Sequence, residues 1–163
     1  MRKRFAGLYT WVVGLAGIAL LGWRLAHSGS LLDDLLSAPY LALLVLFAVL
    51  EIYRVPMRGN IAAGLSAVSI VVAVILGGEL PAMAMSLGGL AILVNGRNKF
   101  RAAVFNVGTY AISAAAGGAV AALVGYPVEG PSAALRITGP LIFVTAYALV
   151  TTILVAIYSA LTA

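Results

Sequence analysis

The sequence predicts an all-α integral membrane protein, a bundle of six transmembrane helices with both termini in the cytoplasm. Of its 163 residues, 63% are hydrophobic and only 9% are charged, whereas a soluble domain carries roughly 25% charged residues. The apolar residues gather in long runs, and the Lys and Arg residues collect mostly at one end of those runs. A soluble domain of this length needs more polar surface. The bilayer is therefore the expected solvent, and the first partner, of most side chains.

The apolar runs divide a single domain, residues 1–163, into helices that approach the length needed to cross a bilayer. About 20 helical residues cross about 30 Å of hydrocarbon. The expected helices cover residues 5–23, 38–53, 60–78, 80–95, 102–125 and 137–161. Between the third and fourth helices only Glu79, with Gly78 and Pro81, interrupts the apolar sequence, a combination typical of a tight turn. A re-entrant pair of helices is the alternative there.

The distribution of cations predicts the orientation. Eight of the ten Lys and Arg residues fall on one side of the predicted membrane, and two, Arg24 and Arg136, fall on the other. Short loops rich in Lys and Arg stay in the cytoplasm, so the N-terminus is expected inside, as is the C-terminus after an even number of crossings. The run from Phe5 to Leu21 is longer than the apolar part of a signal peptide. We therefore expect an uncleaved first helix in a bacterial cytoplasmic membrane, and we expect no nucleic-acid partner.

Residues suited to catalysis are sparse. The chain has no cysteine and one histidine, His27, and it contains no HExxH motif, no phosphate-binding glycine loop and no nucleophile elbow. A metal site would require His27, Asp33 and Asp34 to fold together, and a solvated loop is the favoured interpretation. The sequence therefore predicts a protein that is not an enzyme, with no catalytic residue, no metal and no cofactor.

Glu51 is the only acidic residue within a predicted helix. A carboxylate inside a bilayer is costly and often marks a proton or cation site. Arg54, three residues later on the same helical face, offers a simpler interpretation, an ion pair at the level of the lipid headgroups. We favour this ion pair of Glu51 and Arg54, with Pro56 ending the helix directly after it.

A polar stripe runs along the fifth predicted helix, where polar residues recur at the spacing of one helical face. The stripe and its expected partners on the sixth helix are Asn106, Thr109, Tyr110, Ser113, Tyr147 and Thr151. Hydrogen bonds between helices in a bilayer are worth about 0.6 kcal/mol on average. These side chains are candidates either for hydrogen bonding between helices or for a ligand-binding pocket, and the sequence leaves both open.

The glycine content also predicts close packing between helices. The chain has 18 glycines, most of them in the apolar runs, and small residues let helices approach closely in lipid. The segment SAAAGGAVAA, Ser113 to Ala122, makes the fifth helix a surface for close packing. This packing occurs either within one bundle or in a homodimer formed through the Gly/Ala-rich helix faces.

Several short motifs together resemble a known kind of domain. They are "VPMRGN", "SAVSIVVAVILGGELPAMAMSLGGLAI" and "FNVGTYAISAAAGGAVAALVG", the last preceded by the basic loop Arg97–Arg101. This series, from about Glu51 to Ala160, resembles the multi-helix membrane input domain at the N-terminus of bacterial HD-GYP and GGDEF signalling proteins. The "PV" of that pattern stands here in the inverted order, Val55–Pro56. The resemblance implies a sensory module that couples an external or membrane-borne stimulus to a cytoplasmic signalling output domain, either on a longer chain or on a separate protein.

A second resemblance implies a different function. The small six-helix layout is also similar to the S component of energy-coupling-factor transporters, which implies a subunit that binds a vitamin-like solute. Its small-residue segment "GLAGIALLG", Gly14 to Gly22, would then dock on a transport partner. A structural subunit of a larger membrane complex is the third hypothesis.

Overall fold

The computed structural model describes residues 2–28, 37–53, 55–56, 62–63, 67–95, 100–126 and 133–162. Its elements are α1 (Arg2–Ala26), α3 (Ala38–Ile52), β1 (Val55–Pro56), β2 (Ala62–Ala63), α4 (Ala67–Gly77), α5 (Glu79–Met85), the 3₁₀ helix η1 (Ser86–Asn95), α6 (Phe100–Leu123) and α7 (Ala133–Thr162). Because α5 continues directly into η1, six helical segments result within these residues. The predicted all-helical fold is confirmed, apart from one antiparallel pair of very short strands.

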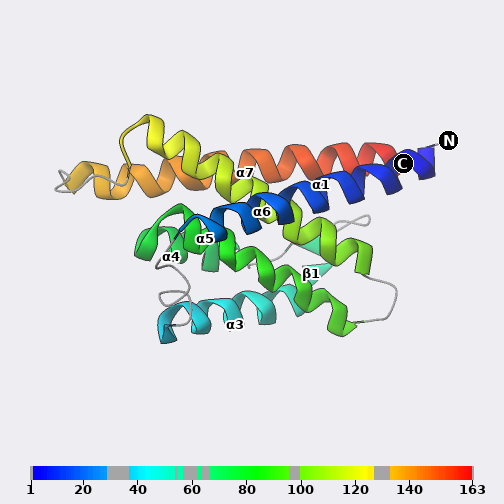
Figure 1. Cartoon of the computed structure of the whole chain (residues 1–163), viewed down its shortest axis with the longest axis horizontal. Helices are drawn as coiled ribbons and strands as arrows, with labels where there is room; N and C mark the ends of the chain where they lie inside the picture. Colours follow the sequence, from blue (N-terminus) through cyan, green and yellow to red (C-terminus); the bar gives the residue numbers. More distant parts are fainter. Residues whose placement is uncertain are drawn as a thin grey trace.

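The centre of the bundle is α6, which packs against α1, α5, η1 and α7. In Figure 1, α1 and α7 run along one side of the molecule with the two chain ends close together, and α3 forms the opposite side. α1 and α7 are antiparallel, and the Tyr9 hydroxyl of α1 donates a hydrogen bond of 2.9 Å to the Leu154 carbonyl of α7. α3 contacts α6 mainly through η1, which lies between them. α6 therefore contacts η1 and α7 directly, and α4 also contacts both α3 and α7.

Three helices among the described residues are long and apolar enough to cross a bilayer, by length and composition. They are Arg4–Ala26, Phe100–Leu123 and Thr138–Thr162, which belong to α1, α6 and α7. The remaining apolar helices are shorter. The 11 residues of α4 extend only about 16 Å at 1.5 Å per residue, about half of the hydrocarbon thickness. Six complete crossings stay a prediction.

The third predicted helix begins later than expected. The predicted start at residue 60 is wrong, because α4 begins at Ala67 and Ala62–Ala63 forms strand β2. Val55 pairs with Ala63 and Pro56 with Ala62 in an antiparallel register. Pro56 has no backbone N–H and fixes an extended φ, which suits an edge strand. A short apolar run does not by itself distinguish strand from helix.

The fourth predicted helix has the expected bounds, but its second half is a 3₁₀ helix. η1 has 10 residues, far more than the three or four that are usual for this conformation. Leu87, Leu90 and Leu93 follow one another at three-residue spacing, and all three are exposed. A 3₁₀ helix has three residues per turn, so these leucines form one straight exposed stripe.

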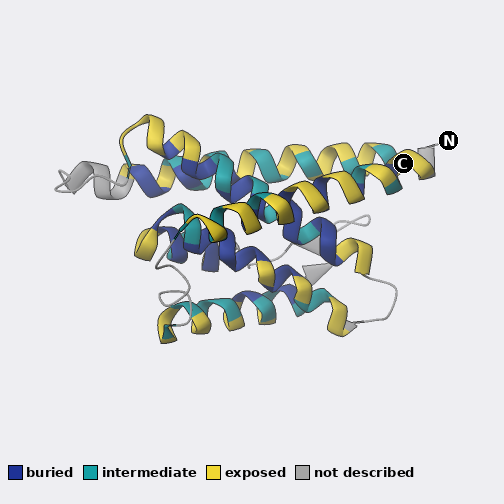
Figure 2. Cartoon of the chain, viewed as in Figure 1, coloured by how far each residue is buried: buried dark blue, intermediate teal, exposed yellow. Residues whose placement is uncertain are grey.

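The apolar core lies between α3, α4, α5, α6 and α7, and α1 contributes Leu21 to it. Its most deeply buried side chains include Phe47, Ile70, Val74, Met83, Ala111, Ala114 and Phe143. Figure 2 shows buried residues concentrated along α5 and the middle of α6, whereas α1 and α7 expose residues along much of their length. The exposed residues of α1 and α7 include many large apolar side chains. The bundle thus presents an apolar outer surface as well as an apolar core.

Candidate functional site

The polar stripe of α6 lies within the bundle. Thr109 and Ser113 are buried, and Asn106 and Tyr110 are half-buried. The four side chains do not converge on one point. Asn106 lies beside η1, since a Cβ atom added at Gly89 would be 3.3 Å from the Asn106 Cβ atom. The structure therefore divides the stripe among several neighbouring helices.

On one face of α6, the stripe contacts the last turn of α3. The Tyr110 hydroxyl donates a hydrogen bond of 2.8 Å to Oε1 of Glu51. The Glu51 side chain is only 1% exposed. Phe47, one turn earlier in α3, meets the Tyr110 ring edge-on, with ring centroids 5.4 Å apart. A buried carboxylate is costly unless it is hydrogen-bonded, and Tyr110 supplies such a bond from the neighbouring helix.

Glu51 lies in the last turn of α3, as expected, and the structure adds a partner that the sequence did not predict. Glu51 is buried against α6 and bonds to Tyr110, a residue 59 positions later in the chain. Arg54 lies outside the described residues, so its ion pair with Glu51 stays a prediction. Sequence reasoning missed the Tyr110 contact because helical spacing relates only residues three or four positions apart.

At Ser113, three residues after Tyr110, the stripe contacts α7. The Thr151 hydroxyl donates a hydrogen bond of 2.9 Å to the Ser113 hydroxyl. One turn further along α6, a Cβ atom at Gly117 would lie 2.9 Å from the Phe143 carbonyl oxygen. Tyr147 is buried, and its ring stacks on that of Phe143 at 6.5 Å between centroids. Ser113, Tyr147 and Thr151 are therefore brought together at the α6–α7 contact.

Thr109 lies between these two contacts in the sequence of α6. Its hydroxyl is buried and has no hydrogen-bond partner in the structure. A buried hydroxyl without a partner is destabilising by about 1–3 kcal/mol. The Thr109 hydroxyl thus does not stabilise the bundle through a hydrogen bond.

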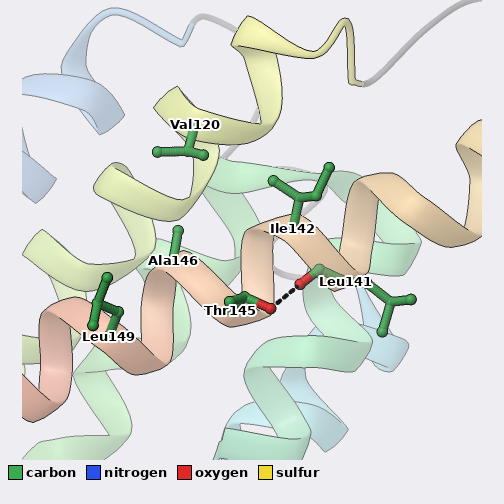
Figure 3. Close-up of a pocket in the computed structure, with 6 residues that line it drawn as sticks. All are labelled: Val120, Leu141, Ile142, Thr145, Ala146 and Leu149. Atoms are coloured by element: carbon green, nitrogen blue, oxygen red, sulfur yellow. Dashed lines mark hydrogen bonds between the residues drawn. The ribbon is translucent and has the colours of Figure 1, made fainter.

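An open apolar groove lies on the surface between α6 and α7. It is lined by Val120, Leu141, Ile142, Thr145, Ala146 and Leu149 (Figure 3), and its volume is about 410 Å³. The Thr145 hydroxyl donates its hydrogen bond to the Leu141 carbonyl at 2.8 Å. The lining thus directs little hydrogen-bonding capacity into the groove, and it includes none of the predicted site residues.

At the opposite end of the bundle from the chain termini, a charged pair joins three elements. Nη2 of Arg24, near the end of α1, lies 3.0 Å from Oε1 of Glu79, at the turn between α4 and α5. A Cβ atom at Gly118 of α6 would overlap the Glu79 carboxylate. Burial raises the pKa of Glu79, and the positive charge of Arg24 opposes this effect. The sequence placed both residues on the outer side but gave no signal that they meet.

Among the residues that the structure describes, His27 does not lie in a group of metal ligands. Its Nδ1 atom is 2.8 Å from the Trp23 carbonyl oxygen, and the ring is exposed. Asp33 and Asp34 lie outside the described residues. In the part of the chain that the structure describes, no three His, Asp or Glu side chains lie close enough to hold a metal ion.

The glycines of α1 form its closest helix contact. Cβ atoms added at Gly14 and Gly17 would overlap Val104 and Gly108 of α6, so the two backbones touch where the helices cross. Gly22, later in α1, has no atom within 4 Å of such a position. The Gly14–Gly17 face is therefore occupied by α6 of the same chain. A homodimer through Gly/Ala-rich helix faces stays a prediction, and it would have to use faces other than Gly14–Gly17.

Comparisons of the chain with family models, with curated proteins and with solved structures give no match. The two resemblances noted above therefore rest on the sequence motifs alone.

Proposed function

We propose that the chain is a multi-pass protein of the bacterial cytoplasmic membrane and acts as an input module that couples a stimulus to a cytoplasmic signalling partner. Support for the membrane placement comes from the outer surface of the bundle. Large apolar side chains such as Leu8, Leu15, Leu141, Leu149 and Ile153 are more than one-third exposed. Contiguous apolar surface of this kind mediates association with a membrane or another protein. Three helices have the length and composition to cross a bilayer, which favours the membrane.

The observation that supports coupling is the pair of hydrogen bonds on α6. Tyr110 holds Glu51 of α3, and three residues later Ser113 holds Thr151 of α7. The two contacts point to different helices from adjacent positions of one rigid element. A rotation or shift of α6 that breaks one contact changes the geometry of the other. In this proposal, α6 is the two-state element whose position depends on both neighbours.

The output leaves through α7. Its last turns lie at the same end of the bundle as the start of α1, where the Tyr9–Leu154 hydrogen bond joins the two helices. Phe105 of α6 contacts Tyr158 of α7 at 5.2 Å between ring centroids. This end carries the basic residues that are expected in the cytoplasm. The resemblance to bacterial input domains agrees with an output on this side.

The vitamin-binding subunit is the weaker alternative. Such a site requires a few convergent polar groups in an enclosed cavity. The groove between α6 and α7 is open and apolar, and the polar side chains of α6 bond to neighbouring helices instead. These contacts therefore support a role of the polar side chains in hydrogen bonding between helices and not in ligand binding.

The coupling is tested by a distance measurement between α3 and α7. The chain has no cysteine, so two introduced cysteines label cleanly. Val49→Cys in α3 and Ile157→Cys in α7 are both at exposed positions. Pulsed electron spin resonance in lipid nanodiscs then gives the distance distribution between the labels. We expect Tyr110→Phe, which removes the hydroxyl bonded to Glu51, to shift this distribution.

Tyr126→Phe is the matched control. Its hydroxyl donates to the Val74 carbonyl of α4 at 3.2 Å. The substitution keeps the aromatic ring that packs on Gly139 of α7, so the distribution should stay unchanged. A single narrow distribution that neither variant shifts would favour a static structural subunit and overturn the coupling. A shift that occurs only on addition of thiamine, riboflavin or biotin would favour the transport subunit.

A further inference from the structure

Two arginines that are far apart in the sequence lie at the end of the bundle that holds the chain termini. Arg4 lies near the start of α1, and Arg101 lies near the start of α6. The guanidinium group of Arg101 lies across Gly7, because a Cβ atom there would be 3.4 Å from its Nη1 atom. Arg4 precedes Gly7 by three residues and so lies on the same side of α1. The tertiary structure thus joins two basic segments into one cationic surface.

Two aromatic side chains complete this surface. Trp11 follows Gly7 by four residues, and its ring lies 6.1 Å from that of Phe100, the neighbour of Arg101. Trp11 is 38% exposed and Phe100 is 57% exposed. The four residues Arg4, Trp11, Phe100 and Arg101 are called the basic–aromatic patch below. Amphipathic aromatic rings beside cations are typical of the headgroup level of a membrane.

The patch carries charge that the described residues do not neutralise. Within those residues the ion pair found is that of Arg24 and Glu79, at the other end of the bundle. Arg4 and Arg101 are both exposed, so their N–H groups are free to meet an external anion. Guanidinium groups bind phosphate oxygens through two parallel hydrogen bonds.

We propose that the basic–aromatic patch binds the phosphate of an anionic phospholipid such as phosphatidylglycerol. The two guanidinium groups hold the headgroup, and Trp11 and Phe100 contact the upper part of the acyl chains. Charge complementarity favours an anionic over a zwitterionic lipid, because a zwitterionic headgroup carries no net negative charge to attract the two arginines. This proposal rests on the membrane placement proposed above but not on the coupling through α6.

The test uses the two tryptophans of the chain. Trp23→Phe leaves Trp11 as the only tryptophan. This protein is reconstituted into phosphatidylcholine vesicles that contain equal small fractions of either brominated phosphatidylglycerol or brominated phosphatidylcholine. Bromine quenches tryptophan fluorescence on contact, so we expect stronger quenching of Trp11 by the anionic lipid. Each arginine near an anionic membrane surface should raise the association constant for the anionic lipid by about fivefold.

Three variants locate the effect. Arg4→Gln with Arg101→Gln should abolish the preference for the anionic lipid, whereas Arg4→Lys with Arg101→Lys should keep most of it. Trp11→Phe leaves Trp23, which is 56% exposed near the other end of α1. The neighbouring cation of Trp23, Arg24, is paired with Glu79, so the quenching of Trp23 should not distinguish the two lipids. Helical circular dichroism in the same vesicles verifies that each variant is folded.

Equal quenching of Trp11 by the two lipids would overturn the patch, as would a preference that survives the double glutamine substitution. No quenching by either lipid would overturn the membrane placement together with the patch. The coupling through α6 has its own readout in the label distances, so either proposal can fail while the other holds.

Discussion

α6 and α7 are both long apolar helices that lie side by side, yet they have opposite surroundings. In its most apolar stretch, 61% of the residues of α6 are buried, against 11% of those of α7. α7 is the more apolar of the two, with Leu141, Leu149, Ile153 and Ile157 exposed. α6 is rich in Gly and Ala and carries the buried Thr109 and Ser113. The more apolar helix is therefore the more exposed one.

A helix bundle in water is expected to show the opposite relation between apolarity and burial. In water the hydrophobic effect buries the more apolar helix. In lipid the acyl chains solvate Leu and Ile, and helices associate through small residues and interhelical hydrogen bonds. α6 has both of these features, and α7 has the side chains suited to acyl chains. The contrast between α6 and α7 is thus the physical argument for a bilayer around this bundle, and the following variants test it.

The largest effect is expected from a charge on the exposed face of α7. Leu149 is 61% exposed near the middle of the helix. Leu149→Asp should oppose membrane insertion by about 2.5–3.5 kcal/mol, measured as the inserted fraction in a translocon-based insertion assay. Leu149→Ala, which keeps the site apolar, should insert almost as well as the natural sequence. A Leu149→Asp protein that instead becomes monomeric and stable in water without detergent would contradict the bilayer assignment.

A smaller loss of stability is expected from a substitution at the close contact between α1 and α6. Gly17 of α1 touches the backbone of Gly108 in α6, so Gly17→Leu must separate the helices. Overpacking of this kind costs about 1–3 kcal/mol, measured as the free energy of unfolding in mixed micelles. Gly22→Leu is the matched control on the same helix, since its added atoms meet open space. Equal losses for the two variants would show that the crossing does not depend on close contact of the backbones.

The smallest loss of stability is expected from removing the hydrogen bond between α6 and α7. Thr151→Val keeps the shape of the side chain but removes the hydroxyl that donates to Ser113. The loss of unfolding free energy should be about 0.6 kcal/mol, the average for such bonds in membranes. Thr152→Val, at an exposed neighbouring position of α7, should have almost no effect. If both variants lose the same amount in mixed micelles, the Ser113–Thr151 bond does not stabilise the α6–α7 contact.

The sequence predicted the helices well and their polar contacts only in part. Apolar runs and breaks at Gly78 and Pro81 located the boundary between α4 and α5 within one or two residues. Helical periodicity placed Ser113 and Thr151 on helices that face each other. The failure at Ala62–Ala63 arose because apolar composition does not separate helix from strand. The 3₁₀ conformation of η1 went unnoticed for a similar reason, since leucines at three-residue spacing also suit one side of an α-helix.

By itself, the sequence determined that this chain is helical and apolar and that its basic residues collect at one end, because composition and periodicity are local properties. The tertiary structure decided which groups meet: Glu51 with Tyr110, Arg24 with Glu79, and Arg101 with Gly7. These pairs depend on how helices cross, and the crossings depend on where small residues let two backbones approach. Such long-range geometry leaves no periodic trace in a single sequence.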